Sequence, residues 1–508
     1  MLRPSFFKKQ IVAKKYMIKV KVKPEDFVVE EIADLSLQKD GNFCVYLLNK
    51  RGWNTVDILK MLSRKFNIPY SHFSYGGKKD KYALTSQYIT IAQKSENQTL
   101  CPFSRPSEQR NKEDGNNSGG RTTNARFLTQ DNTAKSDAIL RHESPVPSKV
   151  DEENYSLSFV GYMDRPMGPN LITGNRFHLV VRNLTEDDLK SALREMDSVK
   201  QDGYPNYFDD QRFGSFDARQ GFVAEKILRK HYNGALKIYF SRIHPEDSKA
   251  EKEHRKFLWE YWGNWQACLK GARSKFEKES FSYLQKDPKG FIPILQRISH
   301  EEMVLFFSAY QSHLWNEVLR KIIRSVSNDN FMPGNSKTIN SSPLPVLSKA
   351  EGMEEVRWGW KEKNDHPPLP PPIKGGGISR RMPDLKIYKG IAGEYLFYAQ
   401  LDDRSKAYLS GLIIPMPASN ITMPDALTEK LYSEVLQENN LKSPMFNIRK
   451  LRQAFFKGIE RRAIITPQDL SVDFAEDEIY QGKKKLILKF FLPRGCYGTM
   501  FIKRLFCC

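Results

Sequence analysis

A glycine-rich segment around one aspartate is the first place in this sequence where the residue types could do chemistry. Residues 75–85 read Y-G-G-K-K-D-K-Y-A-L-T, so Asp80 follows two glycines and lies among three lysines. Glycine allows the tight bend that lets a following side chain project into a cleft. Nearby ammonium groups favour the ionised form of a carboxyl group, which suits a nucleophile or a base. A solvated turn remains the alternative, because a glycine-rich loop with one aspartate is a weak motif.

A second segment combines the side chains that recognition of a nucleic-acid base requires. Residues 206–214 read N-Y-F-D-D-Q-R-F-G. The ring of Phe208 can stack on a base, the amide of Asn206 can read a base edge, and Arg212 can bind a phosphate. The aromatic side chains are equally suited to a hydrophobic core. The adjacent carboxylates Asp209 and Asp210 suggest a metal site only weakly, because neighbours in sequence seldom converge on one ion.

The third segment is P-E-D-F-V-V-E-E at residues 24–31, which follows Lys19, Lys21 and Lys23. Judged by residue types alone, it indicates a strand with a charged outer face.

The elements that must position these segments alternate between strands and helices. Strands are expected at residues 16–35 (with a turn at 24–26), 43–48, 72–75, 86–92, 156–160, 177–181, 485–491 and 499–504. Helices are expected from an N-cap at Thr55 to residue 67, and at residues 218–232, 248–284, 301–326 and 446–458. Strands therefore bracket a central helical block, which is typical of an α+β fold with an insertion.

Three stretches lack the apolar residues that a packed core needs. Residues 95–154 and 333–384 are rich in polar residues, proline and glycine, so we expect two disordered insertions there. Residues 1–15 carry basic residues and no acid, which predicts a basic N-terminal arm.

Charge and cysteine usage narrow the class of protein. The chain has 508 residues, with 80 Lys and Arg against 60 Asp and Glu, a formal charge of +20 that favours a polyanionic partner such as nucleic acid. No apolar run approaches the roughly 18 residues that span a membrane, so no membrane association is expected. The six cysteines form no C-x-x-C motif and the sequence contains no H-E-x-x-H motif, which predicts a cytoplasmic protein without a structural metal.

Together the segments resemble the TruD family of tRNA pseudouridine synthases, in order and spacing, over most of the chain expected to be ordered. The matching segments are residues 24–31, G-K-K-D-K-Y-A-L-T at 77–85, G-N-R-F at 174–177, residues 206–214, S-A-Y-Q-S at 308–312 with Leu314 and Asn316, and L-P-R-G-C-Y-G-T at 492–499. Asp209 departs from the family pattern, which has glycine after N-Y-F, and this places a carboxylate near a turn expected to face RNA.

The resemblance implies a fold and a domain organisation. The fold would be α+β, with a pseudouridine synthase catalytic domain built on a mixed, mainly antiparallel sheet with flanking helices. This domain would comprise residues 16–216 and 446–508, and a TruD-specific α+β domain would be inserted at residues 224–441. The lysine-rich surface of residues 249–278 would bind the tRNA backbone.

The resemblance also implies an activity and roles for particular residues. The family isomerises uridine to pseudouridine, typically uridine 13 of tRNA, after the base flips out of the stack. Asp80 would be the essential carboxylate, acting either as a covalent nucleophile or as a base that leads to a glycal. Lys21 would be its basic partner. The substrate would be bound by Phe27, Asn206, Phe208 and Arg212. No cofactor, metal or obligate protein partner is implied beyond the tRNA substrate.

Two other classes of function stay open at this point. A non-catalytic RNA-binding protein or chaperone would keep the basic surface without turnover. A metal-dependent nuclease would use Asp80 with Asp209 and Asp210.

Overall fold

Strand β8 (Ile172–Leu184) passes from one structural unit of the chain into the other. The structure is a computed structural model that describes residues 18–93, 146–244, 246–327, 385–448, 451, 456 and 458–507. Its small unit is Lys23–Arg176, and its large unit is Met1–Val22 with Phe177–Cys508. The predicted basic arm, the first insertion up to residue 145 and the second insertion lie outside the described residues.

The small unit is one sheet with a helix on it. Its strands lie in the order β2-β5-β3-β7-β6, with β4 paired to β5. Strands β2 and β5 are parallel, and the other pairs are antiparallel. The bounds are β2 Phe27–Ala33, β3 Phe43–Arg51, β4 Phe73–Tyr75, β5 Leu84–Ala92, β6 Lys149–Glu152 and β7 Tyr155–Met163, with helix α1 at Thr55–Lys65. Short 3-10 turns lie at Pro24–Asp26, Tyr70–His72 and Pro169–Leu171.

Helix α1 covers one face of this sheet. Ile58, Leu59 and Leu62 recur at helical spacing, are fully buried, and pack on alternate residues of β3, among them Tyr46 and Leu48. Apolar residues that recur every 3.6 positions along the helix thus meet apolar residues that alternate along the strand, and together they form the core of the small unit.

The end of the first predicted insertion is ordered, so the expectation of disorder is wrong for residues 146–154. Val146 is 1% exposed, and its carbonyl accepts a 2.6 Å hydrogen bond from the hydroxyl of Tyr46. Strand β6 then pairs with β7 as a hairpin. The hairpin supplies backbone hydrogen bonds that compensate for the polar composition of the segment.

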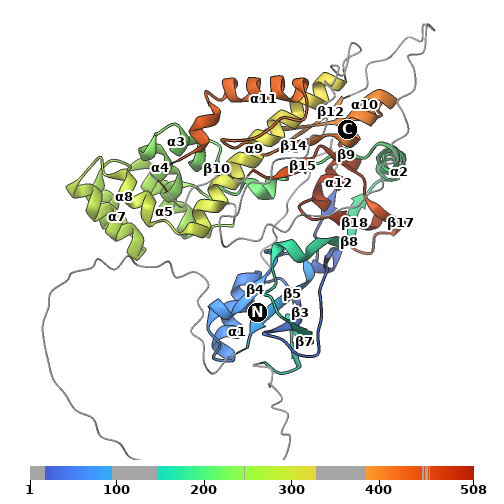
Figure 1. Cartoon of the computed structure of the whole chain (residues 1–508), viewed down its shortest axis with the longest axis horizontal. Coiled ribbons are helices and arrows are strands. Elements are labelled where there is room, and N and C mark those ends of the chain that lie inside the picture. Colours follow the sequence, from blue (N-terminus) through green and yellow to red (C-terminus); the bar gives the residue numbers. More distant parts are fainter. Residues whose placement is uncertain are drawn as a thin grey trace, which may run out of the picture. The chain divides into compact units, whose positions relative to one another are not determined.

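The large unit combines short strands with most of the helices (Figure 1). Its strands are β1 Lys19–Val20, the rest of β8, β9 Tyr204–Pro205, β10 Phe216–Asp217, β11 Gly221–Phe222, β12 Leu385–Lys389, β13 Glu394–Tyr398, β14 Ile413–Pro415, β15 Glu460–Arg462, β16 Ile464–Ile465, β17 Gln468–Glu476 and β18 Lys484–Pro493. Its helices are α2 Glu186–Asp202, α3 Val223–Leu228, α4 Tyr232–Ser241, α5 Lys249–Glu260, α6 Trp265–Gly271, α7 Lys275–Lys286, α8 Phe291–Arg297, α9 His300–Val326, α10 Asp403–Gly411, α11 Ala426–Glu438 and α12 Gly498–Phe506.

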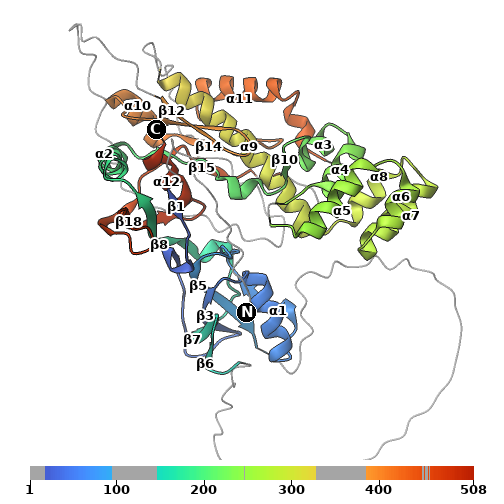
Figure 2. The same cartoon turned by 180° about the vertical axis from the view of Figure 1, so that it is seen from behind.

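Strands β17, β18, β8 and β1 form the sheet of the large unit, and helices α2 and α12 pack beside it (Figure 2). The expected strand at residues 499–504 is wrong, because these residues form α12. The run M-F-I-K-R-L is apolar enough for either element, and periodicity cannot distinguish a short buried helix from a strand. Its two charges are paired inside the unit, Lys503 with Asp209 and Arg504 with Glu195.

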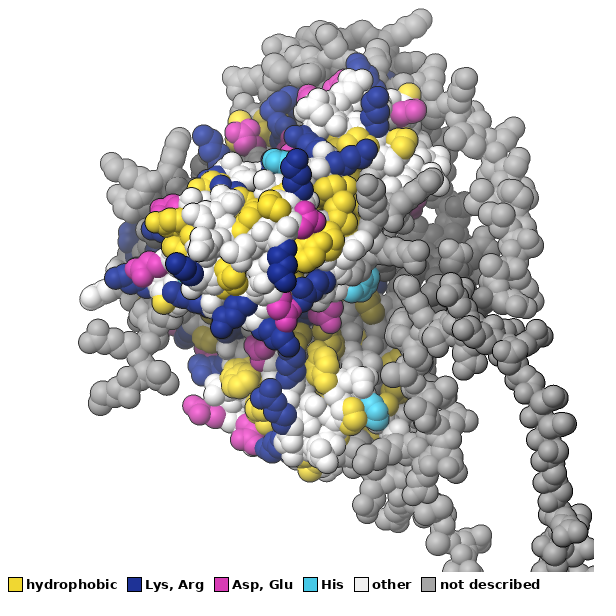
Figure 3. Space-filling view, turned by 90° about the vertical axis from the view of Figure 1, so that its left-hand side faces the viewer, with side chains coloured by type: hydrophobic (Ala, Val, Ile, Leu, Met, Phe, Trp, Pro, Cys, Tyr) yellow, Lys and Arg dark blue, Asp and Glu magenta, His cyan; other side chains and the backbone are white. Residues whose placement is uncertain are grey.

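Helix α9 runs along the large unit, with α11 beside it and helices α3–α8 clustered at one end (Figure 1). The helix expected at residues 301–326 is confirmed as α9. The helix expected at 446–458 is not formed by the described residues of that stretch, where Phe446 ends a 3-10 turn; the others lie outside the description. Lys and Arg side chains spread over the helical end that includes α5 and α7 (Figure 3). No described helix is long and apolar enough to cross a membrane.

Candidate active site

The register of three strands brings the aspartate loop to one edge of the small unit. Val28 of β2 pairs in parallel with Leu84 of β5, and Arg51 of β3 pairs with the same residue from the other side. The loop of residues 76–83 leads directly into Leu84. The start of β2, the end of β3 and the loop therefore meet at the same edge of the sheet.

Thr55 anchors this loop, although the sequence predicts it as a helix N-cap. The N-cap of α1 is Asn54. The buried Thr55 hydroxyl donates to the amide oxygen of Gln87 at 2.7 Å and accepts from the backbone N–H of Lys79 at 3.2 Å. The amide of Gln87 donates to the carbonyl of Gly77 at 3.2 Å. Both ends of the glycine-lysine turn are thus tied to the sheet and to α1.

The lysines around Asp80 in the sequence make different contacts. The ammonium of Lys79 lies 2.6 Å from the buried carboxylate of Glu31 and donates to Asn175 at 2.8 Å. Lys78 is exposed, and the ammonium of Lys81 lies 5.6 Å from the ring centroid of Tyr82. The half-buried Asp80 accepts a 3.0 Å hydrogen bond from the backbone N–H of Tyr82 on Oδ1. Lys79 therefore neutralises Glu31, which the sequence reading did not foresee.

A fourth lysine at this edge, Lys50, was missed by the motif analysis. It is 1% exposed, and its ammonium donates to the backbone carbonyls of Asp80 at 2.7 Å and Trp53 at 2.8 Å. Burial lowers its pKa to about 8, although the Asp80 charge opposes this shift. The alternation of β3 could have revealed it, since Lys50 follows Cys44, Tyr46 and Leu48 on the buried face.

The remaining predicted residues are divided between the units. Phe27 is the first residue of β2 in the small unit and is 4% exposed. Lys21 belongs to the large unit, together with Asn206, Phe208 and Arg212. Lys21 is half-buried and has φ of +61°, a left-handed backbone conformation that is uncommon for residues other than glycine.

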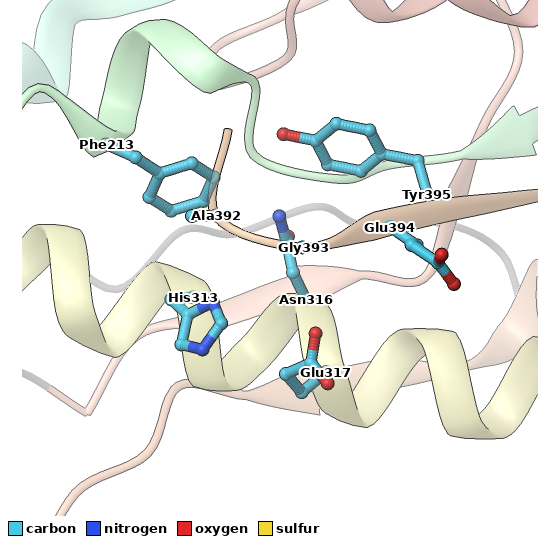
Figure 4. A pocket seen from close by; sticks show the side chains of 8 residues that line it. All are labelled: Phe213, His313, Asn316, Glu317, Ala392, Gly393, Glu394 and Tyr395. Carbon is cyan, nitrogen blue, oxygen red and sulfur yellow. The ribbon is translucent and has the colours of Figure 1, made fainter. Parts of the chain in front are cut away.

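Asn316 of α9 holds the backbone of Phe208. The amide oxygen of Asn316 accepts from the Phe208 N–H, and its amide nitrogen donates to the Phe208 carbonyl, both at 2.9 Å. Figure 4 shows Asn316 rising from α9 beside His313 and Glu317, toward the loop before β13. Asn316 of the helix motif therefore serves to fix the N-Y-F segment.

Aromatic rings surround the side chain of Phe208. Trp315 meets its ring edge-on at a centroid distance of 5.6 Å, and Tyr497 does so at 6.2 Å. The guanidinium carbon of Arg212 lies 5.9 Å from the Phe208 centroid, and its Nε donates to Ser312 at 3.4 Å. Asn206, Phe208 and Arg212 are thus brought together, with Tyr497 as an aromatic neighbour that the sequence reading assigned no role.

Arg461 contacts several residues of this cluster, and the motif analysis did not identify it. Its guanidinium donates to the carbonyl and the side-chain oxygen of Asn206, at 2.8 and 2.6 Å, and to the carbonyl of Gly495 at 2.7 Å. Its guanidinium carbon lies 4.1 Å from the centroid of Phe208. Burial lowers the pKa of Arg461. No carboxylate among the described residues pairs with Arg461 or Arg212, so the cluster carries positive charge.

Asp209 does not face outward from its turn, contrary to expectation. It is 5% exposed, accepts from the hydroxyl of Thr499 at 2.7 Å, and lies 2.5 Å from the ammonium of Lys503. Asp210 contacts the same ammonium at 2.6 Å. Burial raises the pKa of Asp209, but the charge and hydrogen bonds of Lys503 and Thr499 outweigh it and lower the pKa overall.

The carboxylates of Asp209 and Asp210 are therefore paired with the ammonium of Lys503. Within the described ranges, no group of three or more His, Cys, Asp or Glu side chains could hold a metal ion.

Comparison with known proteins assigns this fold and these motifs to one class, the pseudouridine synthases. The family model described as tRNA pseudouridine synthase D (TruD) matches residues 13–104, 133–358 and 398–505. The chain therefore belongs to the TruD family, whose members are enzymes that isomerise uridine to pseudouridine in tRNA.

Individual relatives match along nearly their whole length. The tRNA pseudouridine synthase D of Leptospira interrogans is 30% identical over 96% of this chain and 95% of its own. That of Aquifex aeolicus is 26% identical over 96% of this chain and 98% of its own. A crystal structure named for TruD from Methanosarcina mazei has a TM-score of 0.57 at 19% identity, covers 100% of this chain and 96% of that chain, and supports the α+β fold.

Proposed function

We propose that this protein converts uridine 13 of tRNA to pseudouridine and that Asp80 is the essential carboxylate. The observation that carries the proposal is the anchoring of the Asp80 loop by Thr55, Gln87 and Lys50 at a sheet edge. Such anchoring reduces the freedom of a reacting group before substrate arrives. The family membership supplies the class of substrate.

In the reaction the bond between C1′ of the ribose and N1 of uracil breaks, and a bond between C1′ and C5 forms. The uracil turns between the two steps, C5 loses its proton and N1 gains one, so no oxidant or reductant is consumed. Asp80 acts at the ribose, either by attack on C1′ or by removal of a proton from C2′. Lys21 is proposed to be its basic partner, which assists proton transfer.

A uridine within folded tRNA must leave its stack, at a cost of a few kcal/mol. Phe27, Asn206 and Phe208 are proposed to hold the flipped base or its neighbours, and Arg212 is proposed to bind a phosphate. The exposed lysines of α5, α6 and α7 are proposed to bind the tRNA backbone. A tRNA substrate is consistent with a cytoplasmic location.

The test is pseudouridine formation on a tRNA transcript by wild type, Asp80→Asn and the matched variant Asp151→Asn. Asp151 is an exposed aspartate of the same unit, paired with Lys149. We expect Asp80→Asn to bind tRNA and form no pseudouridine, while Asp151→Asn behaves as wild type. A transcript with cytidine at position 13 should not be modified.

Three results would contradict the proposal in different ways. Full activity of Asp80→Asn would show that the carboxylate of Asp80 is not essential for the reaction. Modification of a different uridine by wild type, with position 13 untouched, would correct the substrate site. Tight tRNA binding by wild type without any pseudouridine would favour a non-catalytic RNA-binding protein.

A further inference from the structure

Lys50 is a buried cation at the edge that carries the Asp80 loop, outside every motif discussed above. It lies next to last in β3, opposite Thr85 of β5 and Tyr155 of β7. With 1% exposure its ammonium must be satisfied inside the protein, because an unpaired buried charge is strongly unfavourable.

We propose that Lys50 is a positioning residue for Asp80: its ammonium bridges the backbone carbonyls of Trp53 and Asp80 and holds the loop in its reactive conformation. This inference rests on the function proposed above. The 2.8 and 2.7 Å contacts join the turn before α1 to the residue that bears the carboxylate. Because the Tyr82 N–H also binds Oδ1 of Asp80, the backbone on both sides of the carboxylate is held.

The positive charge of Lys50 also acts on Asp80. The ammonium of Lys79 is neutralised by Glu31 of β2. Lys50 interacts electrostatically with Asp80 and is repelled by Lys79. Attraction between two charges is mutual, so the ammonium of Lys50 stabilises the ionised carboxylate as well.

The bridge should depend on pH. Burial lowers the pKa of Lys50 to about 8, with Asp80 opposing and Lys79 reinforcing the shift. Below this pH Lys50 is an ammonium and the bridge is charge-assisted. Above it the neutral amine donates weaker hydrogen bonds and no longer stabilises the carboxylate. Turnover is therefore expected to fall as the pH rises through about 8.

The experiment compares wild type, Lys50→Met, Lys50→Arg and the control Lys65→Met between about pH 6.5 and 9.5. Lys65 is an exposed lysine on α1 of the same unit. The measurements are single-turnover pseudouridine formation with saturating tRNA, the dissociation constant for tRNA, and circular dichroism. We expect Lys50→Met to lose roughly 10- to 100-fold in rate, to bind tRNA as wild type does, and to lack the alkaline fall. Lys50→Arg should recover part of the rate and move the alkaline fall to higher pH, since arginine keeps its charge.

The outcomes separate this inference from the function on which it rests. A folded Lys50→Met with the rate and pH profile of wild type would overturn the positioning role while leaving Asp80 untouched. A loss confined to tRNA affinity would overturn it as well. If Lys50→Met did not fold, an alkaline fall at the same pH in Lys50→Arg and wild type would contradict the proposal. Full activity of Asp80→Asn would instead refute the proposed function itself.

Discussion

At the scale of single residues, side chains outside the loop and the N-Y-F segment hold the residues of these two motifs in place. Thr55 and Gln87 hold the loop of Asp80, and Asn316 holds the backbone of Phe208. The side chains of Thr55, Gln87 and Asn316 are buried, and there a satisfied hydrogen bond fixes geometry and a missing one is costly. A reacting carboxylate and a stacking ring need such support because small displacements slow a reaction strongly.

Arg461 offers a test at this scale, on the basis of the proposed function. Arg461→Lys keeps the charge but cannot contact both oxygens of Asn206 and the carbonyl of Gly495 with one planar group. We expect the single-turnover rate to fall roughly tenfold or more while tRNA affinity stays near that of wild type, because phosphate contacts dominate affinity.

The matched control is Arg462→Lys, since Arg462 is the exposed neighbour on β15. It should be indistinguishable from wild type in rate. Equal rates for both variants would show that the geometry of Arg461 does not limit turnover.

At the scale of elements, helix α12 is tied to the N-Y-F segment by a buried ion pair. Lys503, 4% exposed, contacts Asp209 and Asp210, and Thr499 of the same helix also binds Asp209. Burial lowers the pKa of Lys503, but the two carboxylates outweigh it and raise the pKa overall. Asp209, which departs from the family pattern, therefore has a buried ion-pair partner within the same unit.

The pH dependence of this pair follows from the directions of the shifts. The lowered pKa of Asp209 gives stability that is present above about pH 4, the unfolded value, and lost as the pH falls through the folded pKa. The raised pKa of Lys503 gives stability that is present below about pH 10.4 and lost as the pH rises through its folded pKa. The pair thus stabilises the fold across the neutral range.

Lys503→Met should lower the free energy of unfolding by about 3–5 kcal/mol at pH 7, because two carboxylates lose their buried cation. The deficit should shrink toward pH 4, where those carboxylates take up protons. Urea denaturation at both pH values measures this, with the exposed Lys489→Met on β18 as the control. An unchanged urea midpoint at pH 7 would mean that the ion pair does not stabilise the fold.

At the scale of the whole molecule, the helical end of the large unit exposes several lysines. Helices α5, α6 and α7 expose Lys256, Lys270 and Lys278, and none of them pairs with a carboxylate in the described part of the chain. Unpaired exposed lysines are suited to phosphates, whose binding releases counterions. This agrees with the proposed contact between the helical end and the tRNA backbone.

Changing these three lysines to glutamine should weaken tRNA binding and reduce the slope of log affinity against log salt. The reduction should be about 0.7–0.9 per lost phosphate contact, the range between single strands and duplex DNA. The control changes three exposed lysines elsewhere in the large unit, Lys190, Lys430 and Lys442. Titrations at several salt concentrations measure both. If the two triple variants had the same slope, the helical end would not be a specific tRNA contact.

The sequence by itself determined the class of fold, the helix at α9, most strands and the cluster of Asn206, Phe208 and Arg212, because hydrophobic periodicity and local motifs record local structure. Only the tertiary structure decided that residues 499–504 are helical, that Asp209 is buried against Lys503, and that Lys50 and Arg461 support the site. These features depend on partners tens or hundreds of residues away. The role of a charged side chain in an apolar strand or helix can be identified only from the partner that the fold places next to it.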